Sequence, residues 1–470
     1  MTPQPAAVVR PGSGASSGTA APRARIVTAW APSSPADPVA VFEAARRRGK
    51  DAMLWYLPAE GFALVGIGAT LVLEAQGPNR FADVARRWKE IAGGAASRGA
   101  SPSGAAGPVL MGGFAFSPGS NGAIWQGFGD ARLVVPETVF VMETGNARIQ
   151  VHRMGHSGGD GSPGSPEIEA ALDEGLRVVQ DARPVDAGPS GPARELVVED
   201  VPPKDRWEAA VRQAAAAVRQ GRLAKAVLAR SARVSGEGGF VPGAALNQLR
   251  ARYPDCCIFA VARDGACFLG ATPERLVRLK DGFVDVDCLA GSIGRGATPA
   301  DDRRLARALL ESAKDREEHR VVLRRIVEVL DSLCSSLDAP GEPAIRKLAN
   351  VQHLFTPVRG RLKEPAGVLE LAARLHPTPA MGGYPARAAL ELIRDLEEIG
   401  RGWYAGPIGW TGAGGDGEFA VAIRSALLVG DEAWLFSGCG IMGDSDPQAE
   451  YRESCLKLRP MLAALEAAQR

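Results

Sequence analysis

The chain is poor in the residues that bind soft metals. Only 5 of its 470 residues are histidine and only 7 are cysteine. The cysteines form no C-x-x-C pair, and Cys256 and Cys257 are adjacent, which fits neither a zinc knuckle nor a disulfide framework. A metal in this protein would therefore be a hard, oxygen-ligated ion such as Mg²⁺. The same cysteine usage indicates a reducing compartment, so we expect a cytoplasmic protein.

The chain also lacks an excess of either charge and any long apolar run. Its 55 basic and 54 acidic side chains leave a net charge of +1, so composition gives no reason to expect a nucleic acid or an anionic membrane as partner. No apolar run approaches the ~18 residues of a membrane span. Residues 1–24 are rich in Pro, Ala, Gly and Ser without an apolar segment, which predicts a disordered tail and not a signal peptide.

Beyond the tail, predicted strands follow one another in runs and do not alternate with helices. Examples are the strands within residues 257–289 and the hairpins of residues 403–436, whereas residues 299–333 read as one long helix. This order predicts an α+β protein with large antiparallel β-sheets and flanking helices. Residues 182–193 are the best linker candidate. We therefore expect an N-terminal α+β portion (25–195) that packs on the same core as a catalytic portion (196–470).

The most informative stretch lies near the C-terminus. Asp446 is a good N-cap and Pro447 a good first helical residue. A helix that begins there places Glu450, Glu453 and Lys457 on one face, at i, i+3 and i+7. Two carboxylates and an ammonium in that arrangement could hold a divalent cation and an anionic substrate. Taken alone, the pattern is more typical of a solvated surface stripe.

The strand that precedes this helix runs into several glycines. Gly438 and Gly440 are among them, and glycine allows a backbone to approach a ligand closely. A ligand site at the end of this strand is therefore the alternative to the surface stripe.

Three further polar residues are candidates for proton transfer or ion binding. Lys225 opens a predicted strand, and the Thr-Pro pair before Glu274 favours a bend that aims its carboxyl off the sheet. Together they would make a base and an acid across a reaction centre. A lysine of pKa ~10.4 needs burial or a neighbouring cation to act as a base near neutral pH. Glu318 shares a helix face with Lys314, and an ordinary ion pair is the alternative for that spacing.

Assembled in order, these segments resemble the chorismate-utilising enzymes, and among them isochorismate synthases of the menaquinone type. The resemblance covers about residues 200–465. It rests on Lys225-AVLARS, FLGATPERLV (268–277), CLAGSIGRG (288–296), SAKDREEH (312–319), QHLFTPVRG (352–360), LHPTPAMGGYP (375–385), RGWYAGPIGW (401–410), GEFAVAIRSALL (417–428) and GCGIMGDSDPQAEYRESCLKL (438–458).

The resemblance implies a Mg²⁺-dependent conversion of chorismate to isochorismate. Lys225 would activate the water that adds to C2, and Glu274 would protonate the departing C4 hydroxyl. Glu318 and Glu450 would hold Mg²⁺, with Glu453 in support. The resemblance implies a substrate pocket made of Gly291, Ser292, His353, Ala380, Tyr404, Arg424, Gly438, Gly440 and Lys457. The resemblance implies chorismate as the small-molecule substrate and gives no reason to expect a protein partner. We therefore expect a monomer.

Related reactions are distinguished at three positions. Aminodeoxychorismate synthases carry a lysine where this chain has Ala290, and anthranilate synthases lack a lysine at the position of Lys225. Salicylate synthases usually have threonine in place of Ala380. Three alternatives stay open: a salicylate synthase, an isochorismate synthase of a siderophore pathway, and a silent chorismate-binding subunit. The intact acid and base disfavour the last.

Overall fold

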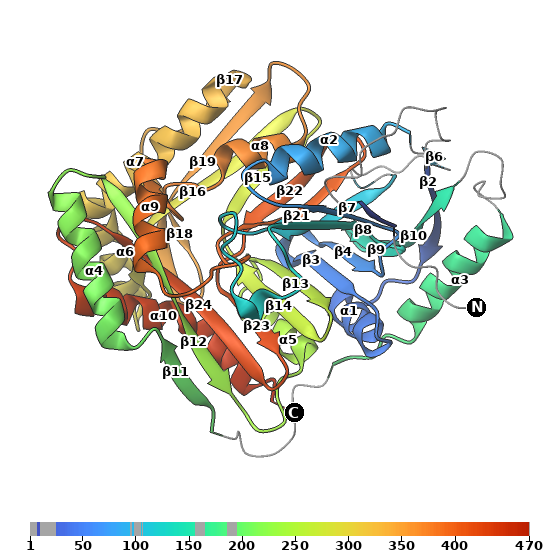
Figure 1. Ribbon diagram of the computed structural model, residues 1–470, viewed down its shortest axis with the longest axis horizontal. Coiled ribbons are helices and arrows are strands. Elements are labelled where there is room, and N and C mark those ends of the chain that lie inside the picture. The colour runs from blue at the N-terminus through green and yellow to red at the C-terminus, as the bar shows by residue number, and fades with distance from the viewer. Residues whose placement is uncertain are drawn as a thin grey trace.

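The computed structural model describes residues 7–9, 25–94, 96–97, 105, 107–155, 165–185 and 195–469. Within these residues, two large β-sheets are flanked by helices (Figure 1). All strand pairs are antiparallel except two short parallel ones that involve residues 7–9 and 96–97. The predicted α+β class with large antiparallel sheets is confirmed. None of the described helices combines the length and apolarity needed to cross a membrane.

One sheet has 11 strands. Across the sheet they are β1 (Ala7–Val9), β5 (Leu71–Ala75), β8 (Ala131–Val135), β7 (Val109–Phe114), β21 (Pro407–Gly412), β22 (Gly417–Val421), β15 (Arg275–Lys280), β16 (Phe283–Gly294), β19 (Val351–Leu362) and β17 (Cys334–Asp338), with β18 (Ala344–Lys347) also paired with β19.

The other sheet has 13 strands. In order they are β11 (Val197–Val201), β12 (Lys225–Ser235), β24 (Glu432–Ile441), β23 (Ser425–Val429), β14 (Ala266–Thr272), β13 (Cys257–Arg263), β3 (Ala52–Leu57), β4 (Phe62–Ile67), β9 (Thr138–Glu143), β10 (Asn146–Gly155), β2 (Arg25–Ser33) and β6 (Ala96–Ser97), with β20 (Gly383–Tyr384) also paired with β12.

Helices cover both sheets. They are α1 (Pro38–Arg47), α2 (Arg80–Ala92), α3 (Pro166–Gln180), α4 (Lys204–Arg219), α5 (Pro242–Arg252), α6 (Pro299–Glu311), α7 (Ala313–Asp331), α8 (Val368–Leu375), α9 (Ala386–Leu396) and α10 (Pro447–Glu466), with short 3-10 turns at Pro58–Glu60 and Ala123–Trp125. Helices α1, α3, α5 and α10 contribute apolar side chains to a core with the 13-stranded sheet. Helix α7 packs on β16 and β19 of the 11-stranded sheet.

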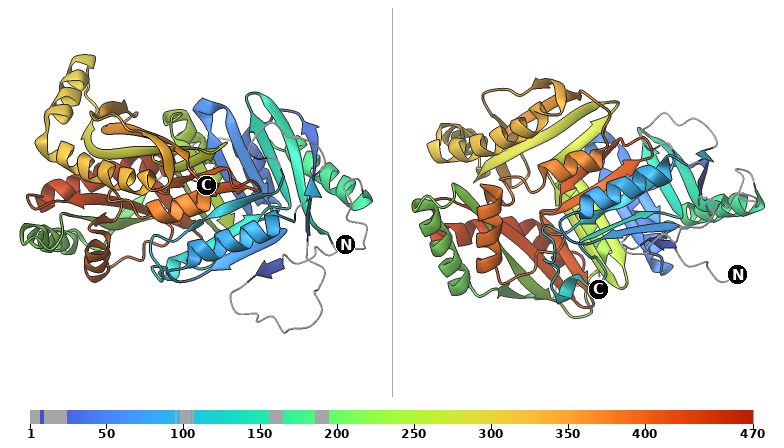
Figure 2. Two further views of the ribbon diagram at one scale, coloured as in Figure 1. Left: turned by 90° about the horizontal axis from the view of Figure 1, so that it is seen from above. Right: turned by 45° about the horizontal axis from the view of Figure 1, so that its top comes forward.

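The N-terminal strands extend both sheets and do not form a sheet of their own. Strand β3 pairs with β13, and β7 pairs with β21. Figure 2 shows α2 beside α8, although the two helices are far apart in the sequence. The division of the chain near residue 195 stays a prediction, and most of the expected linker at 182–193 lies outside the described residues. Within residues 1–24 only Ala7–Val9 are described, as β1.

The predicted long helix over residues 299–333 is wrong in one respect, because two helices occupy this segment. Helix α6 ends at Glu311 and α7 begins at Ala313. Ser312 lies between them in an extended conformation, and its hydroxyl accepts a hydrogen bond from Asp315 N. A serine that caps a new helix in this way interrupts the old one. The break gives α7, which carries Glu318, a direction of its own.

Two of the places where the chain crosses from one sheet to the other are hydrogen-bonded to each other. Residues 273–274 link β14 to β15, and residues 422–424 link β22 to β23. Val421 N donates to Glu274 O (3.0 Å), and Ala271 N donates to Arg424 O (3.1 Å). Arg424 has φ 52°, in the left-handed region that non-glycine residues rarely occupy. Two polar side chains, Glu274 and Arg424, are thus held at the junction of the sheets.

Candidate active site

A cavity of about 130 Å³ lies at this junction. All the predicted site residues line it except Lys225, which reaches it through Glu318. The lining residues among them are Glu274, Gly291, Ser292, Glu318, His353, Ala380, Tyr404, Arg424, Gly438, Gly440, Glu450, Glu453 and Lys457. They come from both sheets and from α7 and α10. The structure therefore brings together residues that span more than 230 positions of the sequence, from Lys225 to Lys457.

Lys225 is buried at the start of β12 and forms an ion pair. Its side chain is 2% exposed, and its Nζ lies 2.6 Å from Glu318 Oε1. A lysine that acts as a base needs burial or a neighbouring cation, and the structure supplies burial, with a carboxylate as direct partner. Gly440 lies against this pair: a Cβ there would be 2.8 Å from Lys225 Cε and 2.9 Å from Glu318 Oε1. A larger residue at that position would force the pair to shift.

Glu274 is a buried carboxyl that keeps its proton. Pro273 offers no N–H to a sheet, and Glu274 N donates to Thr272 Oγ1 (3.2 Å), which turns the chain out of β14. Burial and then the charge of Asp287 raise the pKa of Glu274 to about 8, against the opposing charges of Lys225 and Arg424. The carboxyl is therefore protonated at neutral pH. It can give a proton to a leaving group, as the sequence analysis required of it.

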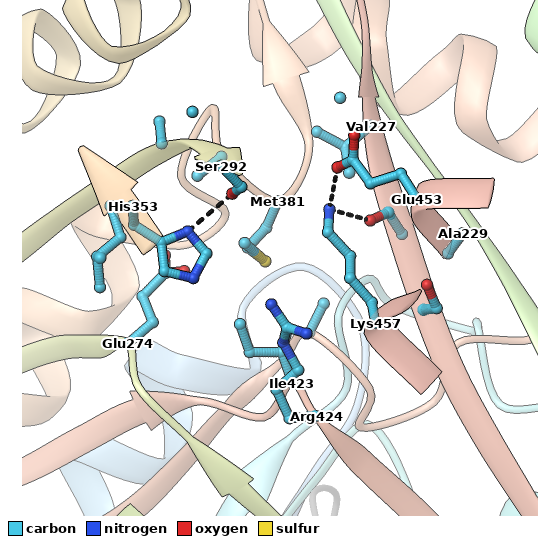
Figure 3. Close-up of a pocket in the computed structure, with 18 of the residues that line it drawn as sticks. Val227, Ala229, Glu274, Ser292, His353, Met381, Ile423, Arg424, Glu453 and Lys457 are labelled. Atoms are coloured by element: carbon cyan, nitrogen blue, oxygen red, sulfur yellow. Dashed lines mark hydrogen bonds and ion pairs between the residues drawn. The ribbon is translucent and has the colours of Figure 1, made fainter. Parts of the chain in front are cut away.

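His353 presents an uncharged imidazole to the cavity. Its Nδ1 lies 2.7 Å from Ser292 Oγ, across the β16–β19 pair (Figure 3). A β-bulge in β16 with Gly291 at φ 76° shifts the register at this point. Burial, and then the charge of Arg424, lower the pKa of His353 to about 3. Its Nε2 is buried and has no hydrogen-bond partner among the described residues, so it is available to a ligand.

Two cations stand opposite Glu274 and His353 (Figure 3). Lys457 Nζ donates to Glu453 Oε1 (2.7 Å) and to Gly438 O (2.9 Å). Burial lowers the pKa of Lys457, but the charge and hydrogen bond of Glu453, together with Cys439, more than offset it and the net direction is upward. Arg424 forms no ion pair with any residue in the part of the chain that the structure describes. Its guanidinium is therefore free to bind an anionic ligand.

Two carboxylates of α10 lie together beside these cations and could hold a hard metal ion. Asp446 caps the helix as predicted, because its side chain accepts from Ala449 N (2.8 Å). Possible ligand atoms of Glu450, Glu453 and Cys439 all lie within 4.8 Å of one another. Burial and the neighbouring Glu453 raise the pKa of Glu450, so the two carboxylates crowd each other, and a divalent cation would relieve that repulsion. These oxygens suit Mg²⁺.

Comparison with known proteins decides the family. Residues 15–466 match the sequence profile of a family described as chorismate binding enzymes. The chain belongs to the chorismate-binding enzyme family.

The chain aligns with two curated relatives over most of the length of each. The salicylate biosynthesis isochorismate synthase of Pseudomonas aeruginosa is 41% identical over 436 residues, which are 92% of this chain and 88% of that protein. The isochorismate synthase MenF of Bacillus subtilis is 37% identical over 447 residues, 92% of each chain. The solved menaquinone-specific isochorismate synthase of Escherichia coli superposes with a TM-score of 0.76 at 23% identity, covers 95% of both chains, and supports the fold.

Some polar residues of this cavity were not among the predicted site residues. Lys314 and Asp315 line the cavity, and Lys314 Nζ lies 3.9 Å from Glu450 Oε1. Arg401 also lines it. All three lie within motifs that carried the family resemblance, so position in those motifs was the available signal. Glu318, predicted as a metal ligand, is not in the carboxylate group of α10, and the contact that the structure gives it is the ion pair with Lys225.

Proposed function

We propose that the protein is an isochorismate synthase that converts chorismate to isochorismate. The observation that carries the proposal is a carboxyl protonated at neutral pH, Glu274, in one cavity with a free guanidinium, Arg424. The first suits the loss of a hydroxyl from the ring, and the second suits an anionic substrate. The relatives named above, which match most of their length, support the same activity.

In the proposed reaction, a water adds to C2 of chorismate and the C4 hydroxyl leaves as water. Lys225 takes a proton from the attacking water, and Glu274 gives its proton to the C4 oxygen, while the ring double bonds shift. Hydroxide is a poor leaving group and water a poor nucleophile, so an acid and a base are both needed. One water enters and one leaves, so the overall change is an isomerisation.

The other predicted residues hold the substrate. Arg424 and Lys457 bind its carboxylates, and His353 Nε2 contacts one of its polar groups. The wall is formed by Tyr404, Ala380, Ser292 and the backbone of Gly291, Gly438 and Gly440. Glu450 and Glu453 would hold Mg²⁺, with Glu318 as a further candidate ligand. When bound there, Mg²⁺ would act as a Lewis acid and neutralise a carboxylate of the substrate.

One incubation separates this proposal from its alternatives. The protein is mixed with chorismate and Mg²⁺, and the products are resolved by chromatography. Isochorismate as the main product supports the proposal. Salicylate with an equal amount of pyruvate would instead identify a salicylate synthase, and unchanged chorismate would identify a silent binding subunit.

The pKa of Glu274 predicts how activity depends on pH. The acid acts only when protonated, so kcat/KM is expected to fall as pH rises through about 8. The charge of Asp287 contributes to the raised pKa, and Asp287 pairs with Arg346 (2.7 Å). Asp287→Asn should therefore move the alkaline limb to lower pH, because it removes a negative charge near Glu274 and leaves a positive one unpaired. A limb that stays in place in this variant would show that another group controls it.

Ala380 is expected to limit loss of pyruvate from the product. Isochorismate can eliminate pyruvate if its C2 proton reaches the enolpyruvyl methylene while the C3–O bond breaks. Ala380→Thr adds a hydroxyl and a methyl to the cavity wall, and a change of ~1.4 kcal/mol between two barriers alters partitioning tenfold. We expect slower isochorismate formation and measurable pyruvate in a coupled assay. Pyruvate no higher than wild type would remove residue 380 from this role.

The cellular setting is a further part of the proposal. A menaquinone pathway is our prediction, and the names of the relatives point both to menaquinone and to salicylate synthesis. We also propose a monomer that works in the cytoplasm. Restored growth of a mutant that lacks a menaquinone-specific isochorismate synthase would support the pathway assignment.

A further inference from the structure

An almost fully buried ion pair lies in the wall of the cavity, just beyond the end of α9. The side chains of Glu397 and Arg401 are 5% and 2% exposed. Arg401 Nε donates to Glu397 Oε2 (2.8 Å), and Arg401 Nη2 also donates to Oε1. Burying two charges is costly, and apolar side chains of the same size would often stabilise a fold equally well. The other hydrogen bonds of the pair indicate what else it does.

The pair forms hydrogen bonds to β12 along a stretch where no strand pairs with that edge. Opposite β24, strand β20 pairs with β12 only as far as Ala226, and β11 pairs with it only from Ser231 onward. In the gap, Arg401 Nη2 donates to Val227 O (2.6 Å), and Ala229 N donates to Glu397 Oε1 (2.7 Å). The two charged side chains thus satisfy backbone groups that a neighbouring strand would otherwise bond. Val227 and Ala229 both line the cavity.

The same arginine also holds the facing wall. Arg401 Nη1 donates to Met381 O (3.0 Å), and Met381 and Ala380 line the cavity. The guanidinium lies 4.0 Å from the centre of the Phe116 ring, and Arg401 O accepts from Tyr404 N (2.9 Å). One planar side chain therefore joins β12 to the segment that carries Ala380.

We propose that Glu397 and Arg401 are positioning residues that set the width of the cavity between β12 and the Ala380–Met381 wall. They act through the backbone of Val227, Ala229 and Met381 and have no part in proton transfer. The width decides how closely chorismate is held against the acid and base. The inference rests on the proposed function, because it concerns the fit of that substrate.

The test is Arg401→Lys. A lysine keeps the charge opposite Glu397, but a single ammonium cannot reproduce the planar fork that serves Glu397, Val227 and Met381 together. We expect the KM for chorismate to rise about tenfold or more and the fraction of pyruvate in the products to increase, since small misplacements of a substrate have effects of this size. The matched control is Arg387→Lys on α9, the helix that ends just before Glu397. Arg387 pairs with Glu391 at the same i, i+4 spacing but is 92% exposed, so KM should not change.

The readout separates positioning from stability. Partial unfolding lowers the amount of active enzyme and hence the apparent kcat, but it leaves KM and the product ratio unchanged. A variant with a lower melting temperature and lower kcat, but wild-type KM and product ratio, would overturn the inference. If Arg401→Lys does not fold, KM and the product ratio can be measured in Glu397→Gln instead. This variant loses the charge that pairs with Arg401, but its amide oxygen can still accept from Ala229 N. A wild type that leaves chorismate unchanged would refute the proposed function itself, and the inference with it.

Discussion

Glu274→Gln is expected to lower kcat by about 10²–10⁴-fold, the usual contribution of a general acid. The substitution replaces one carboxyl oxygen by an NH₂ group and leaves the rest of the side chain unchanged. Glu274 is buried and carries a proton at neutral pH, so glutamine keeps its size and its neutral charge and removes only the transferable proton. Stopped assays of isochorismate formation measure the loss, and thermal melting checks the fold.

The stability of this variant provides an internal check. A carboxyl whose pKa is raised on folding makes a contribution to stability that is fully present below its unfolded pKa of ~4.3 and is lost progressively as pH rises to about 8. Glu274→Gln should therefore melt close to wild type near pH 4 and increasingly better than wild type as pH rises to about 8, above which the difference should stay constant. A variant that keeps more than a few per cent of wild-type kcat would remove Glu274 from the role of acid.

Lys225→Ala is expected to cause a loss of similar size, because it removes the base. It also leaves Glu318 without its partner, so its melting temperature should be measured alongside. Lys280→Ala, an exposed lysine of β15, is the matched control and should keep wild-type activity. Substantial turnover by the Lys225 variant would assign the base to another group.

Glu450→Ala should have the second large effect, on the Mg²⁺ requirement. It removes a carboxylate from the pair on α10, so the Mg²⁺ concentration for half-maximal activity should rise at least about tenfold, which corresponds to ~1.4 kcal/mol of binding free energy. Chelation of the metal should silence the wild type. Titration of activity against Mg²⁺ and direct calorimetric titration of the metal measure the shift.

One control variant lies on α10, and a second test variant lies on α7. Glu466→Ala changes an exposed carboxylate at the far end of α10 and should leave the titration unchanged. Glu318→Ala tests the ligand that the structure pairs with Lys225 instead. If half-saturation is the same as wild type in both the Glu450 and the Glu318 variant, the metal is bound elsewhere.

Local signals predicted part of the site from the sequence, and the family resemblance implied the other pocket residues. The N-cap and first proline of α10 placed Glu450, Glu453 and Lys457 on one face, and the turn before β12 placed Lys225 at its start. These features depend on residues within one or two turns of each other. Such contacts are encoded in short segments, so the sequence alone suffices to find them.

Features that depend on distant segments were not predicted. The run of strands predicted within residues 257–289 gives no sign of a change of sheet. Pro273 nevertheless takes the chain from one sheet to the other, because proline cannot continue the ladder of β14. The break at Ser312 was missed because the charged pattern continues through it. The Glu397–Arg401 pair has the spacing of an ordinary surface pair, and only the fold shows that it lies against the open edge of β12.

The most direct test of the central claim is to run the reaction in water enriched in ¹⁸O. The account holds that a water activated by Lys225 adds to C2 and that the C4 hydroxyl leaves with the proton of Glu274. Isochorismate formed at early times should therefore carry one heavy oxygen, at C2, by mass spectrometry of the isolated product. Unlabelled isochorismate would mean that the hydroxyl moves within the substrate, and chorismate that stays unconverted would mean that the cavity serves another reaction; either result would contradict the account.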